Sequence, residues 1–248
     1  MGQGNHHGRL SQIATPWTDL DQAHAGTLPA LDAARRRLLL RYSPAVYSYL
    51  LGAVRDPDIA DDLFQEFAVR LMRGAFRRAD PRRGRFRDFL KTALGHLVTD
   101  HYRRQGRGPR PYHGRPDPAT DRSPLAEAEE RFAEEWRAQL IDRTFAALEA
   151  FEERTGQPLH TLLQFRADNP DLPVPDLARQ LSGRLGQEPS AAWVYKHLHN
   201  ARQKFADLLV AEVARTLDCP GAEDLAQELA ELGLLRWCRP ALERMKDR

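Results

Sequence analysis

The sequence predicts an all-α protein made of two small helical domains joined by a flexible linker. No sustained alternation of apolar and polar residues indicates a strand, no Asn-Gly pair indicates a hairpin, and Ala, Leu, Arg and Glu recur at helical spacing. The stretch GRGPRPYHGRPDPATDRSP, Gly106 to Pro124, contains too much Gly and Pro for a helix and predicts the linker. We therefore expect a disordered tail at 1–27, a helical domain at 28–105, the linker at 106–123, a second helical domain at 124–215 and a helical extension at 216–248.

The composition favours a globular protein of the cytoplasm. Hydrophobic residues make up 42% of the chain and charged residues 29%, and no apolar run of about 18 residues could span a bilayer. The first twenty residues lack the apolar core of a secretory signal. Cys219 and Cys238 are too few for a disulfide framework or a structural zinc site. We expect no metal, no cofactor and no membrane partner.

Charge is segregated along the chain, although the net charge is only +2. Between Arg82 and Arg115 there are ten Lys or Arg against two acids, whereas between Ala126 and Arg154 there are nine acids against four Arg. A basic block in a nearly neutral protein favours a polyanionic partner for that block.

Three helices are expected in the first domain. The first covers Pro29 to Val54 as one helix or two, with Pro44 marking a kink or a junction. The second has Asp56 as its N-cap and Pro57 in its first turn, and it ends at Gly74. Its apolar stripe consists of Ile59, Leu63, Phe67 and Leu71.

The third helix, FRDFLKTALGHLVTDHYRR, presents two faces. The core face is expected to hold Phe86, Leu90, Ala93, Leu94 and Leu97. Hydroxyl, imidazole, aromatic and cationic groups gather on the other side, and these groups suit unpaired nucleic-acid bases and their phosphates. An ordinary solvated face is the alternative. The candidate DNA-binding residues are Phe89, Thr92, His96, Thr99, Arg103 and Arg104.

The helix around DDLFQEF carries a candidate docking patch for a basic partner. Its polar residues lie three and four positions apart and so share one surface. The alternative is a surface helix with ordinary acids. The candidate docking residues are Asp62, Gln65, Glu66 and Arg70.

Amphipathic helices are also expected in the second half. One begins at Ser123 and Pro124 with Glu127 paired to Arg131, and a shorter one lies near Leu159 to Ala167. Two more, separated by GQEPS, match a helix-turn-helix, with Trp193 in the core. The candidate contacts to duplex DNA are Ser190, Tyr195, Lys196, His199 and Arg202.

An enzymatic role is not expected. The sequence has no Gly-rich phosphate loop, no H-E-x-x-H zinc motif and no G-x-S-x-G nucleophile motif. Its nine histidines do not pair with carboxylates at metal-ligand spacing.

Together these motifs resemble the sigma-70 type of RNA polymerase sigma factor, in the extracytoplasmic-function (ECF) subfamily. The stretch Ala34 to Arg104, with DDLFQE, GRFRDFL and DHYRR, resembles region 2, and Asp176 to Leu209, with VYKHLHNAR, resembles region 4. His96 stands where the family usually has Asn. The resemblance implies a non-catalytic subunit that binds core RNA polymerase and directs it to promoter DNA, where it promotes melting and initiation, and that has an anti-sigma factor or other regulator as a further partner.

The resemblance also implies a role for each candidate set. Asp62, Gln65 and Glu66 dock on the clamp helices of the largest core subunit. The melted −10 element is contacted by Phe89, Thr92, His96, Thr99 and Arg103. The duplex −35 element is contacted by Tyr195, Lys196, His199 and Arg202. Two alternatives stay open: a free-standing helix-turn-helix regulator that binds DNA without polymerase, and an all-helical adaptor that binds protein alone.

Overall fold

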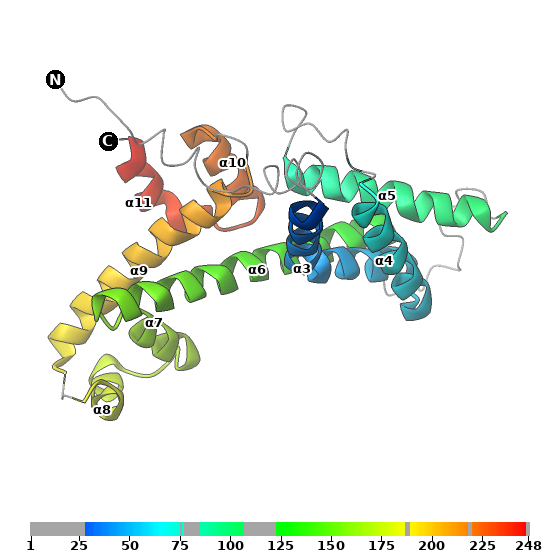
Figure 1. Cartoon of the computed structure of the whole chain (residues 1–248). Coiled ribbons are helices and arrows are strands. Elements are labelled where there is room, and N and C mark those ends of the chain that lie inside the picture. Colours follow the sequence, from blue (N-terminus) through cyan, green and yellow to red (C-terminus); the bar gives the residue numbers. More distant parts are fainter. Residues whose placement is uncertain are drawn as a thin grey trace, which may run out of the picture. The chain divides into compact units, whose positions relative to one another are not determined.

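The computed structural model describes residues 28–74, 76, 85–106, 123–186, 189–217 and 220–246 (Figure 1). Every regular element within these ranges is an α-helix, which confirms the predicted all-α class. The predicted tail at 1–27 and most of the predicted linker lie outside the described residues. The helices are α3 (Leu28–Val54), α4 (Pro57–Met72), α5 (Phe86–Arg104), α6 (Pro124–Thr155), α7 (Leu159–Asp168), α8 (Val174–Leu185), α9 (Ala191–Ala214), α10 (Ala222–Glu231) and α11 (Leu235–Lys246).

The chain divides into two compact units. The first comprises Met1–Ala138 with Ala214–Pro220, and the second comprises Gln139–Val213 with Gly221–Arg248. Helix α6 therefore gives its first part to one unit and its remainder to the other. This division differs from the one expected at 106–123, and the predicted domain boundaries stay a prediction.

Helices α3 and α4 follow the local signals of the sequence. Of the two alternatives for Pro29 to Val54, the structure has a single helix that continues through Pro44. The chain turns at Arg55, whose φ is 54°, and Asp56 then caps α4 by accepting hydrogen bonds from the backbone N–H groups of Asp58 and Ile59 at 3.0 and 3.1 Å. The predicted N-cap is confirmed. The buried residues of α4 are Ala60, Leu63, Phe67 and Leu71, whereas Ile59 is half-buried.

Aromatic rings join α3 to the first part of α6. Tyr42 stacks on Trp136 with ring centroids 4.9 Å apart and an interplanar angle of 13°. Tyr49 meets Phe132 edge to face at 6.1 Å. All four rings are buried, and ring pairs in these geometries stabilise a core beyond the effect of the buried area alone. Residues 124–138, which we expected in the second domain, thus pack within the first unit.

Helices α3 and α6 approach each other closely at Gly52. A Cβ atom added there would lie 2.8 Å from the Cα of Ala128 and 3.1 Å from the Cδ of Arg131. Near this contact, Arg55 donates a 2.5 Å hydrogen bond to Glu127, which also accepts one from Arg131, as the helical spacing predicts. The Arg131 hydrogen bond, with a smaller contribution from Arg55, lowers the pKa of Glu127 below its usual value.

In the second unit, α7, α8 and the N-terminal half of α9 enclose a core of their own. Gly186, with a φ of 65°, ends α8, and Ser190 then caps α9 by accepting a hydrogen bond from the Trp193 N–H at 3.1 Å. Helix α9 runs on to Ala214, beyond the segment that suggested a helix-turn-helix. The buried residues of this core include Leu162, Phe165, Leu177, Leu181, Val194 and Leu198.

The C-terminal extension forms the hairpin of α10 and α11. Its apolar side chains Leu225, Leu229 and Leu232 are all at most 2% exposed. Helix α11 is tied to α9 by a 2.6 Å ion pair between Arg244 and Asp207. Burial raises the pKa of the Cys238 thiol to about 12. This thiol is therefore protonated at neutral pH.

The contact at Gly52 leads to a stability prediction. Gly52→Ala places a methyl group against the backbone of α6, so the helices must separate, and we expect a loss of about 1–3 kcal/mol in the free energy of unfolding. Gly95→Ala is the matched control, because its Cβ would lie 3.5 Å from the Tyr49 hydroxyl, an ordinary contact. Better helix propensity should stabilise this control by up to about 1 kcal/mol. Urea denaturation followed by circular dichroism measures both, and equal stability of the two variants would contradict the close approach.

Candidate nucleic-acid interface

Helix α5 has the two faces expected from its sequence. Phe86, Leu90, Leu94 and Leu97 are each at most 3% exposed, and Ala93 is half-buried at the edge of the stripe. On the other side, Thr92, His96 and Arg103 are exposed. The core face therefore fixes which side chains α5 presents to solvent.

The two threonines of the exposed side already use their hydroxyl hydrogens. Thr92 donates to the backbone carbonyl of Asp88 at 2.9 Å, and Thr99, which is half-buried, donates to that of Gly95 at 2.8 Å. Each hydroxyl oxygen keeps lone pairs. In this conformation both threonines present hydrogen-bond acceptors.

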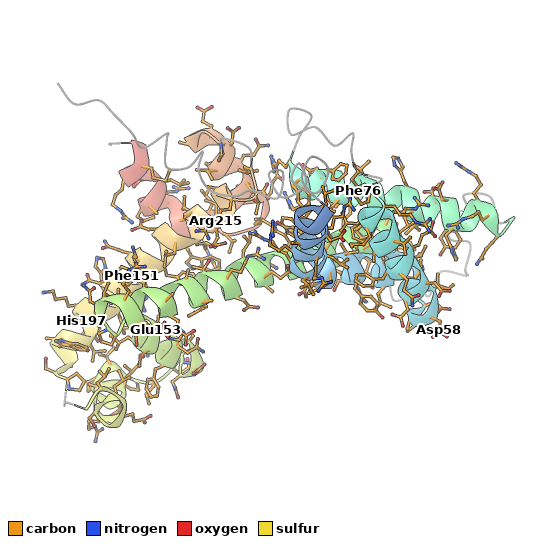
Figure 2. All side chains as sticks on the ribbon, in the orientation of Figure 1. Asp58, Phe76, Phe151, Glu153, His197 and Arg215 are labelled. Carbon is orange, nitrogen blue, oxygen red and sulfur yellow. The ribbon has the colours of Figure 1, made fainter. Side chains whose placement is uncertain are left out.

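Phe89 belongs to an aromatic cluster. Its ring lies 5.5 Å from that of Phe76 in an edge-to-face arrangement and 6.2 Å from that of Phe86, and Phe76 also approaches Phe67 of α4 at 5.7 Å (Figure 2, which labels Phe76). The cluster lines an apolar pocket together with Tyr42 of α3. Phe89 is half-buried as a result, and its stacking on a base stays a prediction.

Charged residues connect α4 to α5. The Glu66 carboxylate accepts a 2.6 Å hydrogen bond from Arg70 of the same helix and a 2.7 Å hydrogen bond from Arg104 of α5. Arg70 also lies 3.6 Å from the carboxylate of Asp100 in α5. We call these four residues the α4–α5 charge network. Of the expected docking patch, Asp62 and Gln65 are exposed, whereas Glu66 and Arg70 are half-buried and paired inside the unit.

The network shifts the ionisation of Glu66. Partial burial alone raises the pKa of this carboxyl, but the hydrogen bonds from Arg104 and Arg70 and their charges outweigh burial, so the pKa lies below its usual value. The same contact with Glu66 raises the pKa of Arg104. The Glu66 carboxyl is therefore ionised at neutral pH and accepts hydrogen bonds from two guanidinium groups.

The basic block is partly neutralised where the structure describes it. Five of its ten cations, Arg82, Arg83, Arg107, Arg110 and Arg115, lie outside the described residues. Of the rest, Arg87 is only 5% exposed, Lys91 lies 3.3 Å from Asp88, and Arg103 lies 3.7 Å from Asp100. The side chain of Arg103 is nevertheless 70% exposed, so it still presents its charge to solvent.

The second candidate surface lies on the N-terminal half of α9. Tyr195 is 61% exposed, and Lys196, His199 and Arg202 are exposed as well, as expected for the outer side of this helix. Trp193 packs against the core of the second unit, as the sequence indicates. Its ring stacks on that of His197 at 3.7 Å, and the His197 Nδ1 lies 2.8 Å from the Trp193 carbonyl (Figure 2, which labels His197). This bond requires a hydrogen on Nδ1.

Two further properties bear on the class of the protein. Among the described residues, no three His, Cys, Asp or Glu side chains group in a way that could hold a metal ion. None of the described helices is both long and apolar enough to cross a membrane.

The part of the site that sequence reasoning missed is the α4–α5 charge network. The pair of Glu66 with Arg70 follows helical spacing and could have been predicted. The pair of Glu66 with Arg104 joins residues 38 positions apart, and a single sequence carries no signal for it. The burial of Arg87 was also missed, because charged residues are usually exposed.

The lowered pKa of Glu66 leads to a prediction about pH. Because its folded-state pKa is depressed, the ion pairs of Glu66 stabilise the fold above the unfolded pKa, and this contribution disappears as the pH falls through the folded pKa. The difference in free energy of unfolding between wild type and Glu66→Gln should be largest near neutral pH, should begin to shrink as the pH falls to the ordinary pKa of a Glu, about 4.3, and should disappear only below the lowered folded-state pKa. It should be small throughout, because partly exposed ion pairs stabilise proteins weakly. Urea denaturation at a series of pH values measures it, and a difference independent of pH would contradict the pairing.

Comparison with known proteins gives one family. Residues 38–108, less than half of the chain, match the model described as sigma-70 region 2. Searches of curated proteins and of solved structures found no match. The matched stretch contains α4, α5 and most of α3, which carry the exposed face of α5 and the α4–α5 charge network. The comparison therefore shows that this stretch of the chain is similar to region 2 of the sigma-70 family.

Proposed function

We propose that this protein is a sigma factor that binds core RNA polymerase and directs promoter recognition, DNA melting and transcription initiation. The observation that supports this most strongly is the match of residues 38–108 to sigma-70 region 2. The helices of that stretch place an acidic patch on α4 and a polar, cationic face on α5. The proposed role is not catalytic. We also propose that it acts in the cytoplasm and belongs to the ECF subfamily, whose regions 2 and 4 the sequence resembles.

In this proposal, α4 supplies the contact to polymerase. Asp62 and Gln65 are exposed on one turn and present acceptor groups to a basic partner surface. Glu66 and Arg70 lie beside them. Before any partner binds, these two residues are already in ion pairs within the protein. Asp62 is therefore the side chain whose charge most directly meets the polymerase.

The proposed contact to the melted −10 element lies on α5. Unpaired bases expose donors and acceptors along their edges, and the hydroxyl oxygens of Thr92 and Thr99 accept from base amino groups. His96 is exposed on the same face, and Arg103 carries an exposed charge for a phosphate. Phe89 supplies the edge of the aromatic cluster, and Arg104 follows at the end of the helix.

The proposed contact to the duplex −35 element lies on α9. A helix capped at Ser190 and preceded by α8 matches a helix-turn-helix, whose second helix contacts base edges through its N-terminal half. Tyr195, Lys196, His199 and Arg202 all project from that half. This pair of helices also favours the second candidate function, a free-standing regulator that binds DNA without polymerase.

Reversing the charge at Asp62 distinguishes the two functions. Asp62→Lys should weaken association with core polymerase tenfold or more and reduce promoter-dependent run-off transcription, because a cation then faces a basic partner. Glu134→Lys is the matched control, since Glu134 is an exposed acid of the same unit on α6. Pull-down and run-off assays with purified core polymerase measure both effects. Normal transcription by Asp62→Lys would contradict the docking role, and DNA binding without any core association would favour the regulator.

Neutralising α9 tests the DNA contact of the second unit. Lys196→Ala combined with Arg202→Ala should weaken binding of the polymerase complex to its promoter and lower the slope of log affinity against log salt by about 2, because two cations that neutralise DNA charge are lost. Gln203→Ala, a neutral exposed neighbour on the same helix, should leave the slope unchanged. The promoter comes from sequencing the DNA that the protein occupies in its own cell, and its binding is then titrated at several salt concentrations. An unchanged slope in the double variant would contradict the α9 contact.

A further inference from the structure

One ion pair connects the two surfaces that the proposed function assigns to different partners. Glu66 belongs to the docking patch of α4, and Arg104 lies at the end of the DNA-facing helix α5. Their side chains meet at 2.7 Å in the isolated protein. The carboxylate that Glu66 would offer to polymerase and the guanidinium that Arg104 would offer to DNA are therefore paired with each other.

The pairing reduces what both residues can contribute. Arg70 and Arg104 each donate to a different oxygen of the Glu66 carboxylate, so a basic group of polymerase would compete with both of them for its charge. Arg104 in turn has its charge neutralised locally and adds little to the attraction of a phosphate. It is nevertheless 59% exposed, so DNA can reach it once the pair opens.

The network is built so that Arg104 can leave without separating the helices. Arg70 contacts Glu66 at 2.6 Å and Asp100 of α5 at 3.6 Å, and these contacts do not involve Arg104. The helices are also joined by the aromatic cluster of Phe67, Phe76 and Phe89. Opening the Glu66–Arg104 pair is therefore a change of side-chain position, and partly exposed ion pairs of this kind are weak enough to exchange partners.

We propose that the Glu66–Arg104 pair is an exchangeable latch, in which docking of Glu66 on polymerase releases Arg104 for a DNA phosphate. The inference rests on the proposed function, because it takes polymerase and DNA as the two partners. Linkage requires the effect to be reciprocal, so DNA held by Arg104 must strengthen docking through Glu66 by the same factor. A weak pair limits that factor to about twofold to fivefold.

The DNA half of the latch can be tested on the full chain without polymerase. The probe is a fluorescent single-stranded oligonucleotide of mixed sequence, titrated by anisotropy at several salt concentrations. Glu66→Gln should bind about twofold to fivefold more tightly than wild type, with a salt slope steeper by about 0.7, because one more cation reaches a phosphate. Glu134→Gln removes the same charge from an exposed site of the same unit and controls for net charge.

Adding Arg104→Gln to Glu66→Gln should remove the gain. The proposal is overturned if Glu66→Gln and Glu134→Gln bind the oligonucleotide with equal affinity. It is also overturned if the double variant binds as tightly as Glu66→Gln. Circular dichroism first confirms that each variant is folded. Since these measurements do not involve polymerase, they test the latch separately from the role as a sigma factor.

The polymerase half is tested with Arg104→Gln alone, which does not depend on the folding of a Glu66 variant. Core polymerase should bind this variant about twofold to fivefold more tightly in the absence of DNA, because Glu66 has lost one competitor. Arg36→Gln is the matched control, since Arg36 is an exposed cation of α3 in the same unit and belongs to neither proposed contact surface. Equal core affinity of the two variants overturns the latch, whereas a lack of core association in wild type overturns the proposed function itself.

Discussion

The first unit depends on the burial of Tyr42. This ring is 2% exposed and lies between two others, with Phe86 of α5 at 5.0 Å and Trp136 of α6 at 4.9 Å. One side chain of α3 therefore contacts both α5 and α6, and this contact holds Phe86 on the inner face of α5. Because Phe86, Leu90, Leu94 and Leu97 then face inward, the polar residues of α5 must face solvent. The candidate DNA surface follows from a packing constraint on its opposite side.

The rigid core and the charged surface respond differently to a binding partner. Aromatic and aliphatic contacts among α3, α4, α5 and the first part of α6 have fixed shapes, and the close approach at Gly52 leaves little room for movement. The α4–α5 charge network lies at the rim, where water competes for every ion pair. A partner can rearrange these charges at small cost in free energy while the helices stay in place. This difference makes exchange at Glu66 compatible with a stable fold.

Local patterns made much of the fold predictable. The cap at Asp56, the stripe of Leu63, Phe67 and Leu71, and the pair of Glu127 with Arg131 all depend on residues within one or two helical turns. Contacts between distant segments were not predictable from one sequence. Nothing local indicates that Trp136 stacks on Tyr42, or that Glu127 meets Arg55, 72 residues away. For this reason the Gly and Pro content of 106–123 suggested a boundary, yet the residues just after it pack in the first unit.

The side-chain contacts of the candidate site were likewise not predictable from one sequence, and they change the role that each residue can have in binding DNA. Sequence spacing correctly placed Thr92, His96 and Arg103 on the exposed face, but it could not show that Phe89 packs on Phe76 or that both threonine hydroxyls donate to the backbone of their own helix. The Phe89 ring is held in a cluster, and the hydroxyls of Thr92 and Thr99 present only acceptors. In the proposed surface, His96 is therefore the side chain that can offer both a hydrogen-bond donor and an acceptor. A neutral imidazole carries one donor and one acceptor on opposite sides of its ring, so it can pair with either kind of group on a base edge. An Asn amide, which the sigma family usually has at this position, offers the same two functions on a shorter side chain. Compared with that Asn, a histidine keeps both hydrogen-bonding functions and places one of them, Nε2, farther from the helix, so we expect His96 to affect which base is preferred more than whether DNA is bound.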